Sequence, residues 1–452
     1  MDAIERFAAH VVGTDFADLP AEAVEAARTF ILDSLGVGIV GSAGPWTGNL
    51  AALQETWGQA PQARVWVTGQ ALPAPAAAMC NAYQIHNSEF DCIHEAAVVH
   101  ATTVVLPCLL AVAERDGGLA GRDLMTAVVL GVDVACHVSL AARTGMRFFR
   151  PATAGALAAV AGLGKARGFD QATLVNAFSI AYGQICGTMQ AHAEGSGLLA
   201  MQMGFNARNA VVACDMAAAG FDAPKNVLEG PFGYLRLIEA EYDLEPVWPE
   251  LGRTWRIAEM AHKPFPSGRA THGVVDACLS LMREHGFSAE QVEAVVARVP
   301  PLVHRLVGRR PAVGMTSNHA RLCGAYVAAC ALLGGTVGVD DFDAAALRDP
   351  RRLLLADRID LQIDDNPDPN ALVPVTVDLS LRDGARHELR LEAVYGSPAK
   401  PLDREAHLAK FRSNCAAASR PLSEHAQMSM IDCIDGLEGV ADVRTLVDAA
   451  IA

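Results

Sequence analysis

The chain has 452 residues and a formal net charge of −15, and 51% of its residues are hydrophobic while 19% are charged. This composition excludes a disordered chain, and the negative charge disfavours nucleic acids and anionic membranes as partners. Apolar runs such as residues 103–113 are shorter than the ~20 residues of a membrane span. The N-terminus lacks the basic start of a signal peptide and the cysteines form no CxxC pair, so we expect a cytoplasmic protein with reduced thiols.

The first half of the chain shows the apolar periodicity of helices and almost no strand signal. Residues 61–72 are the exception, because they favour a short extended piece. Pro20 opens the second helix and Gly220 follows the last, which are positions typical of helix ends. The predicted helices cover residues 2–12, 21–41, 48–57, 75–87, 100–115, 121–143, 153–167, 171–188 and 199–219.

Strand signals begin near Arg253 and end before the C-terminal tail. An Asp383-Gly384 turn predicts a hairpin over residues 375–394. The other predicted elements are strands over residues 253–260, 291–299 and 357–364, helices over residues 270–285 and 318–334, and a helical tail over residues 403–452.

This order of elements predicts a mainly α protein with two lobes. A large all-helical domain combines residues 1–252 with the tail, residues 399–452. Residues 253–398 form an inserted α+β lid domain, and a ligand cleft is expected between the two lobes.

Residues 86–100 carry a high density of acids and histidines. Between Arg64 and Arg115 the chain has no Lys or Arg that could pair with them, as on an ordinary surface helix. Burying such ionisable groups beside an apolar helix costs free energy unless they pair with one another or serve in catalysis. We therefore interpret them as a polar active site. A satisfied buried network and a metal site are the alternatives. The ionisable residues are His86, Glu89, Asp91, His94, Glu95 and His100.

Two basic clusters can supply the field that an anionic ligand needs. Arginines of the first can hold carboxylates bidentately, and the alternative is that they form a solvated helix end. The second lies in a loop stiffened by prolines that leads into a helix N-terminus, a natural anion site. The first consists of Arg143, Arg147 and Arg150, and the second of Lys263, Arg269 and His272.

Several segments, in this order, resemble the MmgE/PrpD family, which contains 2-methylcitrate dehydratase, cis-aconitate decarboxylase and iminodisuccinate epimerase. The resemblance covers nearly the whole chain. It is carried by ARTFILDSLGVGIVGS, the acid- and His-rich NAYQIHNSEFDCIHEAAVVHATTVVLPCLLAVAE, RPATAGALAAVAGLGKARGF, GFNARNAVVACDMAAAGF, VLEGPFGYL, KPFPSGRATHGVVDA and ARLCGAYVAACALLGGTV.

The resemblance implies a homodimer with a cofactor-free site between a helical domain and an α+β lid. Lys263 is similar to the family's lid lysine, His100 to the histidine that closes the acidic segment, and Tyr326 to the tyrosine of a lid helix. Leu199 and Arg150 stand where dehydratase and decarboxylase members carry a lysine and a histidine.

Residues and resemblance together predict a cofactor-independent enzyme that removes a proton α to a carboxylate of a small di- or tricarboxylate. It would then expel water as a dehydratase, or return the proton to the other face as an epimerase. A cis-aconitate-type decarboxylase and a non-catalytic polycarboxylate-binding protein are alternatives. Another is a metal-dependent hydrolase whose ligands are His86, Asp91, His94 and His100.

The expected roles within the site follow from this chemistry. We expect His100 and Lys263 to carry the proton, with Asp91 and His94 setting their pKa values. No metal or other cofactor is expected. The expected substrate-binding residues are Glu89, Arg150, Arg269, His272, Tyr326 and Gln202.

Overall fold

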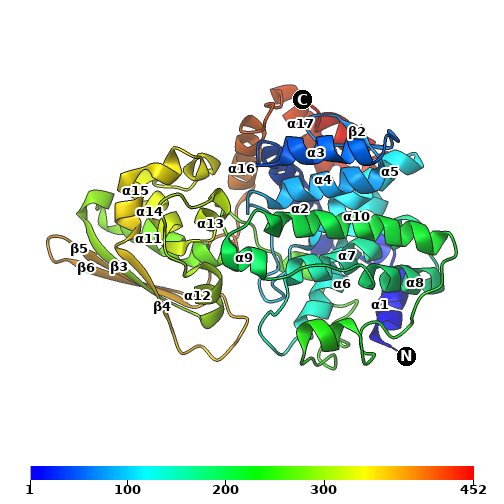
Figure 1. The fold of residues 1–452 in the computed structure, drawn as a ribbon, viewed down its shortest axis with the longest axis horizontal. Coiled ribbons are helices and arrows are strands. Elements are labelled where there is room, and N and C mark those ends of the chain that lie inside the picture. The colour runs from blue at the N-terminus through cyan, green and yellow to red at the C-terminus, as the bar shows by residue number, and fades with distance from the viewer. Residues whose placement is uncertain (1) are drawn as a thin grey trace.

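The computed structural model describes residues 2–452 and shows a helical lobe beside a smaller lobe that contains a sheet (Figure 1). The protein is therefore mainly α, as predicted. The helices of the large lobe are α1 (Ala3–Gly13), α2 (Ala21–Gly41), α3 (Thr47–Trp57), α4 (Ala74–His86), α5 (Ala101–Asp116), α6 (Gly121–Leu140), α7 (Arg150–Ala166), α8 (Gln171–Tyr182), α9 (Gln190–Glu194), α10 (Leu198–Ala218), α16 (Arg404–Ala416), α17 (Glu424–Asp435) and α18 (Arg444–Ala449).

The C-terminal tail completes the helical lobe. One continuous hydrophobic core takes buried residues from Ala3 to Met260 and again from Phe411 to Ala450. The tail docks through α16 and α17, which pack on α2. The approach is close, because a Cβ added at Gly36 would lie 2.8 Å from the Phe411 ring. The core of this lobe is therefore shared between the two ends of the chain.

Small residues let the central helices α5, α6 and α7 pack closely. A Cβ at Gly131 of α6 would lie 2.8 Å from the Ala158 carbonyl of α7, and one at Gly155 of α7 would lie 2.7 Å from Val104 of α5. By length and composition α6 could cross a membrane, but 89% of its apolar window is buried inside this lobe. That burial is typical of the core helix of a globular domain.

The smaller lobe has its own core of buried residues between Phe265 and Leu381. Its sheet has the order β4-β3-β5-β6, with β3 parallel to β4 and antiparallel to β5, and β5 and β6 form the predicted hairpin. Helices α11 and α14 pack against the sheet. The elements are α11 (His272–His285), β3 (Val292–Val299), α12 (Pro301–Val307), α13 (Ser317–Arg321), α14 (Gly324–Gly334), α15 (Pro350–Ala356), β4 (Ile359–Ile363), β5 (Val375–Leu381) and β6 (Arg386–Leu391).

The strand predicted over residues 253–260 is wrong. This segment contains a single 3₁₀ turn, Arg256–Glu259, and its apolar residues Trp255, Ile257 and Met260 are buried in the helical core. Asp133 of α6 accepts a hydrogen bond from the Arg256 N–H at 2.8 Å, which fixes the turn on that core. The alternating pattern therefore reflects packing of a turn.

Two other predicted elements differ in detail. Residues 318–334 form two short helices, α13 and α14, instead of one. The extended piece at residues 61–72 is a pair of two-residue strands, β1 (Ala63–Arg64) and β2 (Ala71–Leu72). The domain boundaries at residues 252 and 398 stay predictions.

Candidate active site

The acid- and His-rich segment forms the connection between α4 and α5. Its backbone turns sharply, because Glu89 and Val98 have positive φ angles of 53° and 54°. Non-glycine residues in this region carry strain, which the surrounding structure must offset. Ile93 exchanges two backbone hydrogen bonds with Ala261, of 3.0 and 2.7 Å, so the segment is joined to the chain that enters the lid.

Asp91 is the centre of the polar cluster. Its Oδ2 lies 2.8 Å from His86 Nδ1 and 3.2 Å from His100 Nδ1, and it accepts a hydrogen bond from Thr103 Oγ1 at 2.5 Å. Burial favours the protonated acid, but the charges of His100, His86 and Lys263 together hold the pKa of Asp91 well below its usual value. Asp91 is therefore a carboxylate that orients two imidazoles.

Glu89 and Lys263 form a buried ion pair across the two lobes. Lys263 Nζ donates to Glu89 Oε2 at 3.0 Å and to the Glu89 carbonyl at 3.1 Å, which also supports the strained backbone. Burial raises the pKa of Glu89, but Lys263 and His86 outweigh it and lower that pKa to about 2. The lid lysine thus reaches into the cluster, 3.7 Å from Asp91 Oδ1.

The two histidines on Asp91 have opposite pKa shifts. Burial lowers the pKa of His100 below 6.5 despite the attraction of Asp91, and Lys263 adds to the lowering. For His86, burial also favours the neutral ring, but the charges of Asp91 and Glu89 prevail and raise the pKa above 6.5. When the surroundings push two pKa values apart, the group with the lower pKa is suited to act as a base and the group with the higher pKa as an acid. His100 therefore fits the role of base and His86 that of acid.

The proton of neutral His100 can be placed from its partners. Its Nδ1 lies 2.8 Å from the Cys92 carbonyl, and a carbonyl oxygen only accepts. Nδ1 therefore carries the proton, and the lone pair of Nε2 is free to act as a base.

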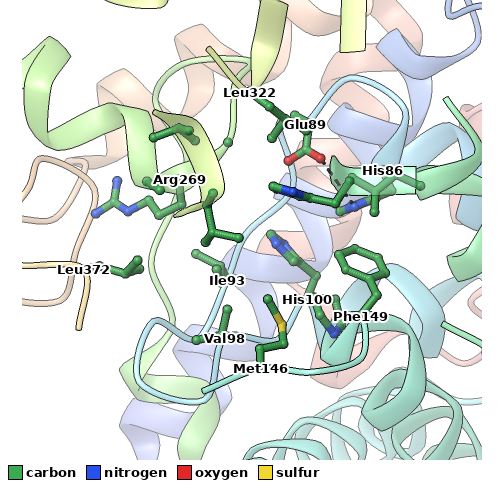
Figure 2. Close-up of a pocket in the computed structure, with 17 residues that line it drawn as sticks. His86, Glu89, Ile93, Val98, His100, Met146, Phe149, Arg269, Leu322 and Leu372 are labelled. Carbon is green, nitrogen blue, oxygen red and sulfur yellow. Dashed lines mark ion pairs between the residues drawn. The ribbon is translucent and has the colours of Figure 1, made fainter. Parts of the chain in front are cut away.

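Both histidines and Glu89 line a cavity of about 60 Å³ between the lobes (Figure 2). Its wall is otherwise largely apolar, with residues of the lid on one side and of the helical lobe on the other. The volume is far below the roughly 300–1,000 Å³ of ordinary ligand pockets. Further lining residues include Ile93, Val98, Met146, Phe149, His192, Leu199, Leu306, Leu322 and Leu372.

Two predicted residues are held by acids of the helical lobe. Arg150 is buried and donates to both carboxylate oxygens of Glu239, at 3.0 and 2.8 Å. His94 Nε2 lies 2.9 Å from Glu259 Oε2, away from the Asp91 cluster. The structure therefore brings neither side chain to the two histidines, and their predicted roles stay untested.

The remaining predicted residues are occupied by partners of their own. Arg269 borders the cavity, but its guanidinium points away from the histidines (Figure 2) and donates to Glu95 Oε1 at 2.7 Å and to the Tyr395 carbonyl at 2.7 Å. His272 lies behind it, with Nδ1 3.3 Å from Arg269 Nη1. Tyr326 is buried in the lid core, where its hydroxyl donates to the Asp341 carbonyl at 2.9 Å. Gln202 bonds the backbone of Thr188.

The models of two domains of a single family together match almost the entire chain. The MmgE/PrpD N-terminal domain matches residues 5–246 and the MmgE/PrpD C-terminal domain matches residues 265–436. The chain belongs to the MmgE/PrpD family.

Two curated relatives match nearly the whole of this MmgE/PrpD protein, and a third matches part of it. It is 27% identical to cis-aconitate decarboxylase of Mus musculus and 28% identical to that of Homo sapiens, over 98% of this chain and 92% and 93% of theirs. A cis-aconitate decarboxylase of Aspergillus terreus is 29% identical over 59% of this chain and 58% of its own. Family and relatives support a carboxylate-processing enzyme.

The Asp91 cluster of this MmgE/PrpD protein can also supply metal ligands. One ligand atom each of His86, Asp91 and His100 lies within 4.8 Å of the others. The adjacent Lys263 ammonium opposes a cation at this position. His94, a ligand in the hydrolase hypothesis, is not part of the set, because it pairs with Glu259.

Sequence reasoning assigned no catalytic role to His86 and did not single out His192. His86 is the last residue of α4, and its five-residue spacing to Asp91 was the available signal. His192 on α9 lines the cavity and is held by Arg309 of the lid, which donates to its carbonyl at 2.8 Å.

Proposed function

We propose that the protein abstracts a proton from the carbon α to a carboxylate of a small di- or tricarboxylate, without a cofactor. The observation that carries this proposal is the pair of histidines on Asp91, whose pKa values are shifted in opposite directions at one cavity. A neutral base beside a protonated acid is the arrangement that proton transfer at carbon needs near neutral pH.

In the proposed mechanism His100 is the base. Its Nε2 takes the proton, and Asp91 stabilises the imidazolium that forms at Nδ1. The negative charge that develops on the substrate carboxylate is stabilised by Lys263, which shifts part of its bonding from Glu89 to the substrate. His86 then serves as the acid.

The acid determines the outcome of the reaction. If His86 protonates a departing hydroxyl, the enzyme is a dehydratase-like lyase; if it returns a proton to the other face of the carbanion, the enzyme is an epimerase. Both outcomes would use the same two histidines, which line the cavity from different segments, the last residue of α4 and the N-cap of α5.

Decarboxylation is the second candidate, and the relatives favour it. The three relatives described above are all named cis-aconitate decarboxylases. Loss of CO₂ produces the same kind of carbanion, which His86 would protonate. Leu199 lines the cavity at the position where the resemblance places a lysine, which removes one cation from the site and leaves the reaction type open.

Proton NMR in D₂O tests the proposal directly. Enzyme is added separately to 2-methylcitrate, citrate, cis-aconitate, malate, tartrate and iminodisuccinate. Deuterium at an α-carbon supports the proposal, a new vinyl signal without CO₂ identifies dehydration, and a new diastereomer identifies epimerisation. Release of CO₂ from cis-aconitate identifies decarboxylation. If compounds of this panel bind but none of them exchanges a proton or gives a product, the proposal of an enzyme is overturned in favour of a binding protein.

The expected homodimer is part of the same proposal, since the resemblance implies it. Light scattering during gel filtration tests it: a mass twice the 47.6 kDa of the chain supports a dimer. A single-chain mass at micromolar concentration would contradict it.

A further inference from the structure

Arg321, the last residue of α13, is a buried cation that lacks a carboxylate partner. Among residues 2–452, no acidic oxygen lies within 4 Å of its guanidinium, and its Nε has no hydrogen-bond partner. Nη1 donates to the Asn87 carbonyl at 3.3 Å, and the group lies over the Phe342 ring. Burial lowers its pKa to about 10, so Arg321 remains charged at neutral pH. The charge of Glu89 offsets part of the burial of this guanidinium from beyond ion-pair distance, and a bound anion would offset more of it.

Arg321 lines a cavity of about 220 Å³ between the lobes. On the opposite wall lie Asn87 and Ser88, which are both buried. Asn87 Oδ1 and Ser88 Oγ also lack hydrogen-bond partners within the described chain. Of these unused groups, the guanidinium N–H and the serine hydroxyl can donate to an oxyanion, whereas Asn87 Oδ1 can only accept, because its amide nitrogen already donates to the Gly41 carbonyl. Because a water molecule takes about 30 Å³, the space also accommodates a small organic anion.

This cavity is distinct from the catalytic one, although the two are adjacent. They share no lining residue. Consecutive residues nevertheless face the two spaces, because Ser88 lines one and Glu89 the other, and Arg321 lines one and Leu322 the other. An occupant of the larger cavity would therefore contact the turn that holds Glu89 in its strained conformation.

Acidic residues also line this cavity and limit what it can bind. Asp340 and Asp343 are exposed, whereas Arg321 is buried. Asp343 Oδ1 already accepts from the N–H groups of Ala345 and Ala346. Water and salt screen exposed charges more than buried ones, so these two acids weaken the attraction of Arg321 for an anion less than buried acids would.

We propose that the cavity between Arg321 and the Asn87–Ser88 turn is a second binding site, for a small oxyanion such as a carboxylate or a phosphate. Arg321 comes from the lid and Ser88 from the helical lobe, so the bound anion joins the two lobes and stabilises their closed arrangement. The proposal does not depend on the reaction that the neighbouring cavity catalyses.

Calorimetric titration tests the site with two probes, succinate and inorganic phosphate, added separately to the full-length protein. The variants are R321Q, S88A, K263A and, as a matched control, R310Q, which changes an exposed arginine of the same lobe. At least one probe should bind the wild type, and R321Q should weaken that binding by about tenfold or more, because a charge-assisted hydrogen bond is lost. S88A should weaken it less, and K263A and R310Q should leave it unchanged.

Which probe binds identifies the oxyanion. Binding of neither probe overturns the site, as does equal binding by R321Q and the wild type. Loss of binding in K263A as well as R321Q also overturns it, because the anion would then occupy the catalytic cavity. Thermal unfolding without ligand separates a binding role from a structural one. R321Q should be at least as stable as the wild type, since it removes a buried charge without an ion-pair partner, whereas a structural arginine would lower the melting temperature when replaced.

Discussion

The ring of His86 lies edge-on against the ring of His100, with 5.1 Å between the centroids and 67° between the planes. Both rings contact the same oxygen of Asp91, yet their pKa values are shifted in opposite directions. The opposite pKa shifts come from the charges other than Asp91. The carboxylate of Glu89 raises the pKa of His86, whereas the ammonium of Lys263 lowers the pKa of His100.

This asymmetry predicts a bell-shaped dependence of kcat/KM on pH. The base His100 must be neutral, so activity should be lost as pH falls through its lowered pKa, on the acid side of 6.5. The acid His86 must be protonated, so activity should be lost as pH rises through its raised pKa, on the alkaline side of 6.5. The Asp91→Asn variant removes the charge that raises the pKa of His86, so its alkaline limb should move to lower pH. A profile that is flat from pH 5 to 9 would contradict both assignments.

Replacement of the base His100, or of Lys263, which stabilises the developing negative charge, should greatly slow turnover. We expect His100→Ala and Lys263→Ala to lower kcat by about 10²–10⁴-fold, the usual contribution of a positioned acid or base. Lys225→Ala is the matched control, because Lys225 lies on the surface and its ammonium contacts only Asp222 and Asn176 among the described side chains, neither of which lines the cavity. Circular dichroism checks that each variant is folded. Wild-type rates in both His100→Ala and Lys263→Ala would contradict the proposed mechanism.

The Glu89–Lys263 pair should make stability sensitive to acid. The pKa of Glu89 is lowered from 4.5 to about 2, so its contribution to the free energy of unfolding is complete above pH 4.5 and is lost as pH falls toward 2. Glu89→Gln should remove this part of the acid sensitivity. At pH 7 it should cost about 3 kcal/mol, the lower end for a broken buried pair, because Lys263 keeps only the more distant Asp91 as a counter-charge.

Urea unfolding of the wild type and Glu89→Gln at several pH values between 3 and 7 measures this difference. Asp91 contributes acid sensitivity of the same sign to both proteins, so the comparison isolates Glu89. Equal free energies of unfolding for the two proteins at pH 7 would contradict the prediction, because they would show that the Glu89–Lys263 pair makes no net contribution to stability.

Arg150 should stabilise the fold instead of binding substrate. Arg150→Met leaves Glu239 buried without its bidentate partner and should cost about 3–5 kcal/mol. The double variant Arg150→Met/Glu239→Leu should recover most of that loss, because no uncompensated charge remains. Denaturant unfolding measures both. An Arg150→Met protein of normal stability with a raised KM would instead restore the substrate-binding role.

The sequence was sufficient for the helical framework because each long helix carries its own apolar periodicity. It failed at residues 253–260, where alternation resembled a strand but arises from Trp255, Ile257 and Met260 packing around a 3₁₀ turn. No local pattern distinguishes these two cases, since the deciding contact is with Asp133 of a distant helix.

For the site, the sequence identified the cluster but not its internal arrangement. It pointed to Asp91, His100 and Lys263, which the structure brings together. It did not assign His86, because the contact with Asp91 depends on a turn through the positive φ of Glu89. Arg150 and Arg269 looked available for a ligand because their acidic partners lie 89 and 174 residues away in the chain.

The small catalytic cavity has a kinetic consequence. About 60 Å³ does not accommodate a tricarboxylate, so the proposed function requires a more open conformation to admit its substrate. If that conformation is the less populated one, the apparent dissociation constant is the intrinsic one divided by the fraction of molecules that are open. The two hydrogen bonds between Ile93 and Ala261 lie at the junction that such opening strains. Weakening that junction would speed substrate entry and product escape, at the cost of letting water reach a reactive carbanion.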